Sequence, residues 1–146
     1  MKALGLPDLL AERGILTQAQ RKEVLALEAK TGRRPVSILL DGGFLTEAQI
    51  VSVLEDSLGL EDAGLDTRPI PPEMARVLPR AAAEHYAIVP VQATWTQVQL
   101  AMADPLDQAA IDTARAAARR RIVPLAALRS AVERTLLALY GPRRGS

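Results

Sequence analysis

The stretch Leu10-Ala-Glu-Arg-Gly-Ile-Leu-Thr-Gln-Ala-Gln20 is followed 29 residues later by Leu39-Leu-Asp-Gly-Gly-Phe-Leu-Thr-Glu-Ala-Gln49. Of the 19 aligned pairs that begin at Leu10 and Leu39, eight are identical. The identities include a glycine, a threonine and two neighbouring apolar residues, so both the turn and the helix positions are shared. We therefore interpret the two stretches as copies of one structural repeat.

Each copy carries the signals of a helix–turn–helix unit. A helix is expected to end at Gly14 and another at Gly43, because glycine readily adopts the left-handed conformation that closes a helix. Thr17 and Thr46 each start a Thr-x-x-Gln capping box, which marks the beginning of the next helix. The apolar face of the second of these helices comprises Ile50, Val53, Leu54 and Leu58. Two such units predict a four-helix bundle over residues 4–58.

The chain changes character after this repeat. Glycine and proline residues between 59 and 71 predict a connector, with room for one short extended segment at 61–69. Short helices are expected to start at Pro72 and at Pro79, the second continuing through Tyr86.

Strand patterns then alternate with helix patterns. The predicted strands are Ala87–Val91, Gln97–Met102 and Ile122–Leu125, with a hairpin connection at Ala93–Thr96 and with Pro124 on an edge strand. Asp107 is expected to cap one helix, and the last helix follows the apolar spacing from Leu128 to Leu139.

The sequence therefore predicts an α+β fold. Residues 1–58 form a helical tandem-repeat subdomain, residues 59–71 a Pro/Gly connector and residues 72–141 an α+β subdomain with a sheet of about three strands. Residues 142–146 are a tail or linker. The change from a 3.6-residue to a 2-residue period near Ile88 supports this division.

Composition excludes several classes of function. The 146 residues contain no cysteine and one histidine, so no disulfide framework, thiolate zinc site or histidine cage is available. Aromatic residues make up 3% and the net charge is +1, which argues against nucleic-acid binding. No G-x-x-x-x-G-K-[ST] phosphate loop is present, and no apolar run is long enough to span a bilayer. We expect a cytoplasmic protein that is not an enzyme by itself and has no cofactor.

A few polar residues allow a second interpretation. Asp104, Asp107 and Asp112 are close enough in sequence for a divalent-metal site, which leaves a metal-dependent phosphoesterase as a remote alternative. Turn and helix-cap roles are commoner for aspartates in an Asp-Pro-x-Asp sequence, and we favour them. His85 is interpreted as a structural residue, and Trp95 as covering the end of the sheet rather than recognising a partner.

Arginines gather in the C-terminal half, which carries net charge +5 from residue 67 onward, counting 11 Lys and Arg against 6 Asp and Glu. Four of them lie along the end of one predicted helix: Arg115, Arg119, Arg120 and Arg121. Cations at that end stabilise a helix, and the cluster also suits an acidic partner surface or anionic lipid headgroups. Arg13, Arg33 and Arg34 in the repeat are interpreted as solvated residues at a helix end and turn.

Four further stretches carry a family resemblance. They are Pro71-Pro-Glu-Met-Ala-Arg-Val-Leu-Pro79, Ile88-Val-Pro90, Leu100-Ala-Met-Ala-Asp-Pro-Leu-Asp107 and Leu139-Tyr-Gly141. Together with the repeat, they resemble the amino-terminal domain of type II secretion and type IV pilus assembly ATPases, from about residue 4 to residue 141. The resemblance implies a non-catalytic docking or regulatory domain. Its implied partners are the ATPase motor or an inner-membrane platform component, and it would be peripheral to the membrane through them.

Many members of that family, those of the MshEN type, bind cyclic di-GMP through tandem motifs like this repeat. The resemblance implies a ligand site made of Leu10, Gly14, Arg34, Leu39 and Gly43, and a cyclic di-GMP sensor is the alternative function. The other recognition positions depart from the motif: Gly5 stands for Arg, Pro7 and Val36 for Gly, and Glu28 and Ser57 for Gln. Because these changes remove a stacking cation and add a negative charge, we expect no binding, or binding no tighter than tens of micromolar, roughly −6 kcal/mol.

Overall fold

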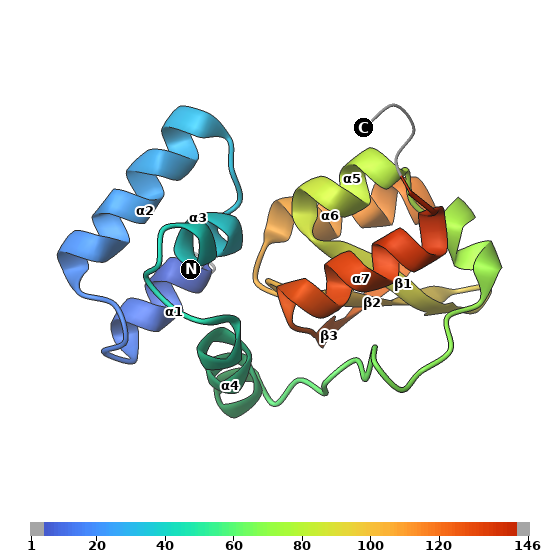
Figure 1. The fold of residues 1–146 in the computed structure, drawn as a ribbon, viewed down its shortest axis with the longest axis horizontal. Helices are drawn as coiled ribbons and strands as arrows, with labels where there is room; N and C mark the ends of the chain where they lie inside the picture. The colour runs from blue at the N-terminus through green and yellow to red at the C-terminus, as the bar shows by residue number, and fades with distance from the viewer. Residues whose placement is uncertain (1–4, 143–146) are drawn as a thin grey trace.

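The computed structural model describes residues 5–142 and begins with the predicted helical repeat (Figure 1). Its helices are α1 (Leu6–Glu12), α2 (Gln18–Thr31), α3 (Pro35–Asp41) and α4 (Glu47–Leu58). Gly14 and Gly43 have φ angles of +75° and +73°, so both turns use the left-handed conformation. Thr17 Oγ1 accepts from the Gln20 amide at 3.1 Å, and Thr46 Oγ1 accepts from the Gln49 amide at 3.2 Å. The turn glycines and both capping boxes are confirmed.

The four helices do not form a self-contained bundle. Ile50 and Leu54 of α4 are buried, and α4 packs against strand β3 (Arg121–Ala126). Leu58 is 41% exposed, so the apolar face of α4 is shorter than its sequence pattern predicted. One cluster of buried side chains extends from Leu6 in α1 to Leu136 in α7 (Arg129–Tyr140). The helical repeat and the α+β part therefore share a core.

The connector contains the short extended segment that the sequence allowed. The Ala63 amide donates to the Ala126 carbonyl at 2.8 Å, and the Ala126 amide donates to the Glu61 carbonyl at 2.9 Å. A 3₁₀-helix (Pro72–Arg76) and α5 (Arg80–Tyr86) follow, close to the two positions at which proline predicted helices.

The three predicted strands are confirmed in the part of the chain that the structure describes. They are β1 (Ile88–Ala93), β2 (Gln97–Met102) and β3, in the order β1-β2-β3. β1 and β2 are antiparallel, whereas β3 runs parallel to β2 because α6 (Gln108–Ala118) crosses between them.

Helices cover both faces of this sheet. Ile88, Leu100 and Met102 pack with Ala110 and Ala114 of α6 on one face. The alternate residues Val89, Val91 and Ala101 join the larger core, to which α5 and α7 contribute Ala83, Val132 and Leu136. Successive side chains of a strand point to opposite faces of the sheet. Because helices cover both faces, β1 and β2 are apolar along most of their length.

Each outer strand has a proline near its middle. Pro90 of β1 and Pro124 of β3 are both in register with Leu100 of the central strand β2. The pairing of β1 also shifts between Pro90 and Gln92, as at a β-bulge. The predicted edge position of Pro124 is confirmed.

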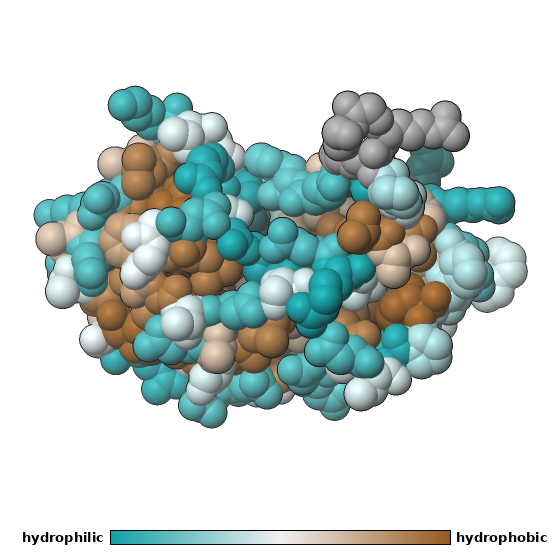
Figure 2. Space-filling model, viewed as in Figure 1, coloured by the Kyte–Doolittle hydropathy of each residue, from teal (hydrophilic) through white to brown (hydrophobic). Residues whose placement is uncertain are grey.

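Polar contacts join α3 and α4 to the start of α7. Asp41 pairs with Arg129 at 2.9 Å. Glu47 accepts from the Ser130 amide at 3.0 Å and from the Ser130 hydroxyl at 2.5 Å. The N-cap residue of α7 is Leu128, which makes no side-chain cap, so Glu47 supplies the missing acceptor from a different helix. Figure 2 shows hydrophilic residues between the apolar surface over the helical repeat and the α+β part.

Candidate functional site: the Arg34 junction

The five residues that the resemblance assigned to a ligand site have different surroundings in the structure. Leu10 and Leu39 are fully buried members of the shared core. The Gly14 amide donates to the Ala11 carbonyl and the Gly43 amide to the Leu40 carbonyl, so both are occupied within their turns. Arg34 caps the start of α3, whereas Gly43 follows its end. Four of the five residues therefore build the repeat, and Arg34 alone has a polar side chain for recognition.

Arg34 links the repeat to the α+β part. Its Nε donates to Asp107 Oδ2 at 2.7 Å and its Nη2 donates to Asp107 Oδ1 at 2.6 Å, a bidentate pair. The Arg34 side chain is 15% exposed and that of Asp107 is 1% exposed. The interpretation of Arg34 as a solvated turn residue is wrong. Arg33 is half-exposed and bonds Asp41 at 2.5 Å, and Arg13 bonds Ser57.

Two more groups surround this guanidinium. Glu28 Oε2 lies 3.7 Å from Arg34 Nη2, and the Arg34 guanidinium carbon lies 5.4 Å from the centre of the Tyr86 ring. The hydrogen bond to Asp107 is the main reason that the pKa of Arg34 is raised above its usual value. We call these four residues, Arg34, Asp107, Glu28 and Tyr86, the Arg34 junction. The cation is held by neighbours from α2, α5 and the start of α6.

Asp107 has a second role as the predicted helix cap. Its Oδ1 accepts from the Ala110 amide at 3.3 Å, at the start of α6. One carboxylate therefore fixes both the first turn of α6 and the position of Arg34. Sequence reasoning identified the cap but missed the arginine, because the two residues are 73 positions apart.

Asp104 lies beside the junction as a buried acid. It is 2% exposed, and its Oδ1 accepts from the Leu106 amide at 3.0 Å. Burial, and next the negative charge of Asp107, raise the pKa of Asp104 to about 7. The charged and neutral forms of Asp104 therefore interconvert near neutral pH.

The acidic residues do not assemble the metal site that the sequence left open. Asp112 is exposed on α6 and pairs with Arg115 at 2.5 Å, while Asp107 is engaged by Arg34. No group of three or more His, Asp or Glu side chains within residues 5–142 is placed to hold a metal ion. Asp104 and Asp107 instead perform the turn and cap roles that the sequence favoured for the Asp-Pro-x-Asp stretch.

A groove with charged walls follows the junction. Its first section, about 300 Å³, is lined by Arg33, Arg34, Ser37, Asp41, Glu84 and His85 among others. The next section, about 450 Å³, shares Ser37 and Glu84 and reaches Arg129 and Leu137. Its cations already have acidic partners, since Arg33 and Arg129 both pair with Asp41 and Arg80 pairs with Glu84. The groove therefore carries little net positive charge toward an anionic ligand.

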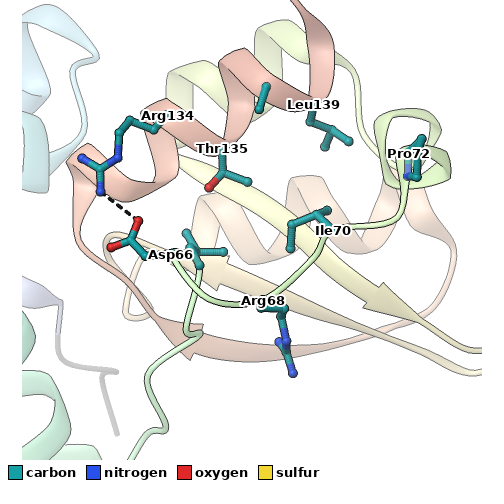
Figure 3. Close-up of a pocket in the computed structure, with 9 residues that line it drawn as sticks. Asp66, Arg68, Ile70, Pro72, Arg134, Thr135 and Leu139 are labelled. Carbon is teal, nitrogen blue, oxygen red and sulfur yellow. Dashed lines mark hydrogen bonds and ion pairs between the residues drawn. The ribbon is translucent and has the colours of Figure 1, made fainter.

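A second hollow of about 390 Å³ lies between the connector and α7 (Figure 3). The Arg134–Asp66 pair, 3.0 Å apart, closes one end, and Ile70, Pro72 and Leu139 form apolar walls. These side chains include no nucleophile beside a base, so the hollow has no evident catalytic chemistry.

The structure agrees with the role that the sequence predicted for His85 but not with the role predicted for Trp95. His85 is an exposed residue whose ring packs edge-on against Tyr86 at 4.7 Å, in keeping with a structural role. Trp95 is 99% exposed, so the prediction that it covers the end of the sheet is wrong.

Comparison with known proteins agrees with this fold. The MshEN domain family matches residues 58–146. The type IV pilus assembly ATPase PilB of Myxococcus xanthus is 24% identical over 107 residues, which cover 73% of this chain and 19% of PilB. PilB of Thermus thermophilus is 27% identical over 105 residues, which cover 70% of this chain and 12% of that PilB. The chain thus spans less than a fifth of these curated relatives.

Two solved structures are similar over almost the whole chain. The structure of MshE with cdg, cyclic di-GMP, is 26% identical, with a TM-score of 0.64, and the match covers 92% of this chain and 98% of that one. The N-terminal domain of XpsE is 23% identical, with a TM-score of 0.73, and the match covers 97% and 100%. Within residues 5–142, no helix has both the length and the apolar character needed to cross a membrane.

Proposed function

The chain belongs to the MshEN domain family, and we propose that it is a non-catalytic docking and regulatory domain associated with a type II secretion or type IV pilus assembly ATPase. Its match to less than a fifth of each PilB sequence supports the role of one domain in a larger machine. The sequence has no phosphate-binding loop, so nucleotide hydrolysis would reside in the motor.

The Arg34–Asp107 pair is the observation that carries this proposal. It joins the repeat to the α+β part through two charge-assisted hydrogen bonds at a nearly buried position. The two parts consequently present one fixed surface, as a docking domain requires. We place the domain in the cytoplasm, with the ATPase motor or an inner-membrane platform component as its partner and with peripheral membrane association through that partner.

Co-purification tests the docking role. The tagged chain should retain the assembly ATPase motor or the platform protein of its own organism. Arg34→Met should weaken this retention because it removes one of the contacts that fix the two parts relative to each other, whereas Arg33→Met, which removes only an exposed pair, should keep it. Retention of neither protein by the wild-type chain, or hydrolysis of ATP by the purified chain alone, would contradict the proposal.

Cyclic di-GMP binding is the second candidate, and the similarity to MshE with cdg favours it. Against tight binding, the guanidinium of Arg34 is held by Asp107, and the position that would hold the first arginine is Gly5. Glu28 adds a negative charge 3.7 Å from Arg34. We propose that cyclic di-GMP binds with a Kd no tighter than tens of micromolar, roughly −6 kcal/mol.

Titration of the purified chain, followed by amide chemical shifts, tests this. The variant Asp107→Asn keeps a helix cap but removes the charge that holds Arg34, and it should bind cyclic di-GMP more tightly than the wild type does. Submicromolar saturation of the wild type, with shifts at Gly14, Arg34 and Gly43, would instead identify the repeat as a sensor.

A further inference from the structure

The turn between β1 and β2 projects the chain's only tryptophan into solvent. Trp95 is 99% exposed, and Thr94 and Thr96 beside it are exposed as well. The turn lies at the end of the sheet away from α1–α4 (Figure 1). A single exposed apolar residue is common and carries no meaning by itself, so the surroundings of Trp95 decide its significance.

The backbone of this turn is held firmly. The Thr94 amide donates to the Gln97 carbonyl at 2.8 Å, and the Gln97 amide donates to Thr94 Oγ1 at 3.2 Å. Arg120 braces the turn from the end of α6, donating to the Thr94 carbonyl and the Ala118 carbonyl, each at 3.1 Å. The tryptophan therefore projects from a fixed support.

Arginines adjoin the turn at the same end of the sheet. Arg121 is exposed, and its amide donates to the Thr96 carbonyl, so it adjoins the turn. Arg119 is exposed and has no acidic partner among the described residues. Neither residues 92–98 nor residues 115–123 contain an acidic side chain. The turn and the adjoining end of α6 thus combine exposed positive charge with an exposed indole ring.

Arg119 occupies a position whose backbone conformation favours glycine. It ends α6 with φ +55°, a left-handed conformation that costs an ordinary residue roughly 1 kcal/mol. The Arg119 side chain therefore adds charge at a position where the backbone conformation alone would favour glycine.

We propose that the Trp95 turn, with Arg119 and Arg121, is a contact surface for an anionic lipid bilayer. Tryptophan favours the level of the headgroups, where its ring is apolar and its indole N–H is hydrated, and arginines attract anionic headgroups. A projecting turn enters a bilayer interface without a matching pocket. A protein partner would need a pocket shaped to the indole, so the observed geometry favours the lipid surface.

Vesicle binding tests the proposal directly, because all tryptophan emission of the full chain comes from Trp95. With vesicles of phosphatidylcholine and phosphatidylglycerol, the emission should shift to shorter wavelength and be quenched by brominated lipid. Pure phosphatidylcholine should give much less of either effect, and added salt should reverse them.

Variants separate this surface from folding. Arg119→Gly relieves the backbone and Arg121→Ala removes an exposed charge, and each should weaken binding to the anionic vesicles about fivefold. Arg115→Ala is the matched control, because Arg115 is also exposed on α6 but pairs with Asp112, and it should change binding little. Trp95→Ala should abolish most sedimentation with the vesicles.

Three outcomes would overturn the proposal. One is unchanged emission with anionic vesicles at low salt. Another is vesicle binding that Trp95→Ala and Arg119→Gly leave intact. The third is loss of a purified protein partner in Trp95→Ala when vesicles are not bound by the wild type, which would assign the turn to a protein interface.

Discussion

The two copies of the repeat share their turns but differ in what their polar residues contact. In the second copy, Arg34, Asp41 and Glu47 bond to Asp107, Arg129 and Ser130 of the α+β part. Their counterparts 29 residues earlier are Gly5, Glu12 and Gln18, for which the structure shows no such contact. The shared residues make the helix–turn–helix unit, and the differing residues attach one copy of it to the rest of the domain.

The helices that follow the two turns differ in the same way. Arg21 of α2 pairs with Asp8 at 2.7 Å, whereas Ile50, at the equivalent position of α4, is buried. Only Val24 is buried on α2, while Ile50, Val51 and Leu54 are buried on α4. The first copy is therefore the outer one, and the predictions for Arg34, Glu47 and the two capping threonines test this contrast.

Arg34→Met should have the largest effect. It leaves Asp107 charged, buried and unpaired beside Asp104, and we expect a loss of about 3–5 kcal/mol in the free energy of unfolding, measured with urea. Arg33→Met should cost less than about 0.5 kcal/mol, because its pair with Asp41 is exposed. Combining Arg34→Met with Asp107→Asn should recover part of the loss, and similar losses for Arg33 and Arg34 would contradict the assignment of the junction.

Asp104 should make stability depend on pH. Its native pKa of about 7 lies above the unfolded value, so the native state retains a proton that the unfolded chain has released. The free energy of unfolding should therefore fall by about 2–3 kcal/mol between about pH 5 and pH 8. Asp104→Asn, which resembles the neutral acid, should flatten this dependence in chemical unfolding at both pH values. An equal fall in the variant would place the titrating group elsewhere.

Glu47→Ala should cost about 1–2 kcal/mol, because the start of α7 loses the side-chain acceptor that Glu47 provides. Gln18→Ala, the corresponding truncation at the equivalent position of the first copy, should be close to neutral. Thermal unfolding of the two variants compares them directly. A comparable loss in both would remove the distinction between the inner and outer copies.

Thr17→Ala and Thr46→Ala should have the smallest effects and nearly equal ones. Each removes one capping-box acceptor at an exposed helix start, at a cost of about 1 kcal/mol. Urea unfolding of both variants would show whether the shared residues of the repeat contribute equally. A clear inequality would mean that attachment to the α+β part also alters the turns.

Local signals predicted most of the fold. Gly14, Gly43, Thr17 and Thr46 act on their own neighbourhood, so their roles follow from the sequence, and strand β2 begins and ends where its alternation predicted. The Arg34–Asp107 pair could not be predicted in this way, because it depends on how α3 and α6 approach each other. The exposure of Trp95 was likewise missed, since it depends on which neighbours reach the turn.

The two prolines aligned with Leu100 also bear on how the domain behaves when many copies are crowded together. The outer strands of an open sheet present unpaired backbone groups to which another chain can add a strand, and this is a common route to aggregation. Proline is tolerated in such a strand where its missing N–H would face away from the sheet, and the bulge in β1 disrupts the pairing further. Near β3, the backbone pairing of residues 61–63 with Ala126 occupies part of the remaining edge. Both edges therefore resist extension, and neighbouring domains can be held close together without their sheets joining into a continuous one.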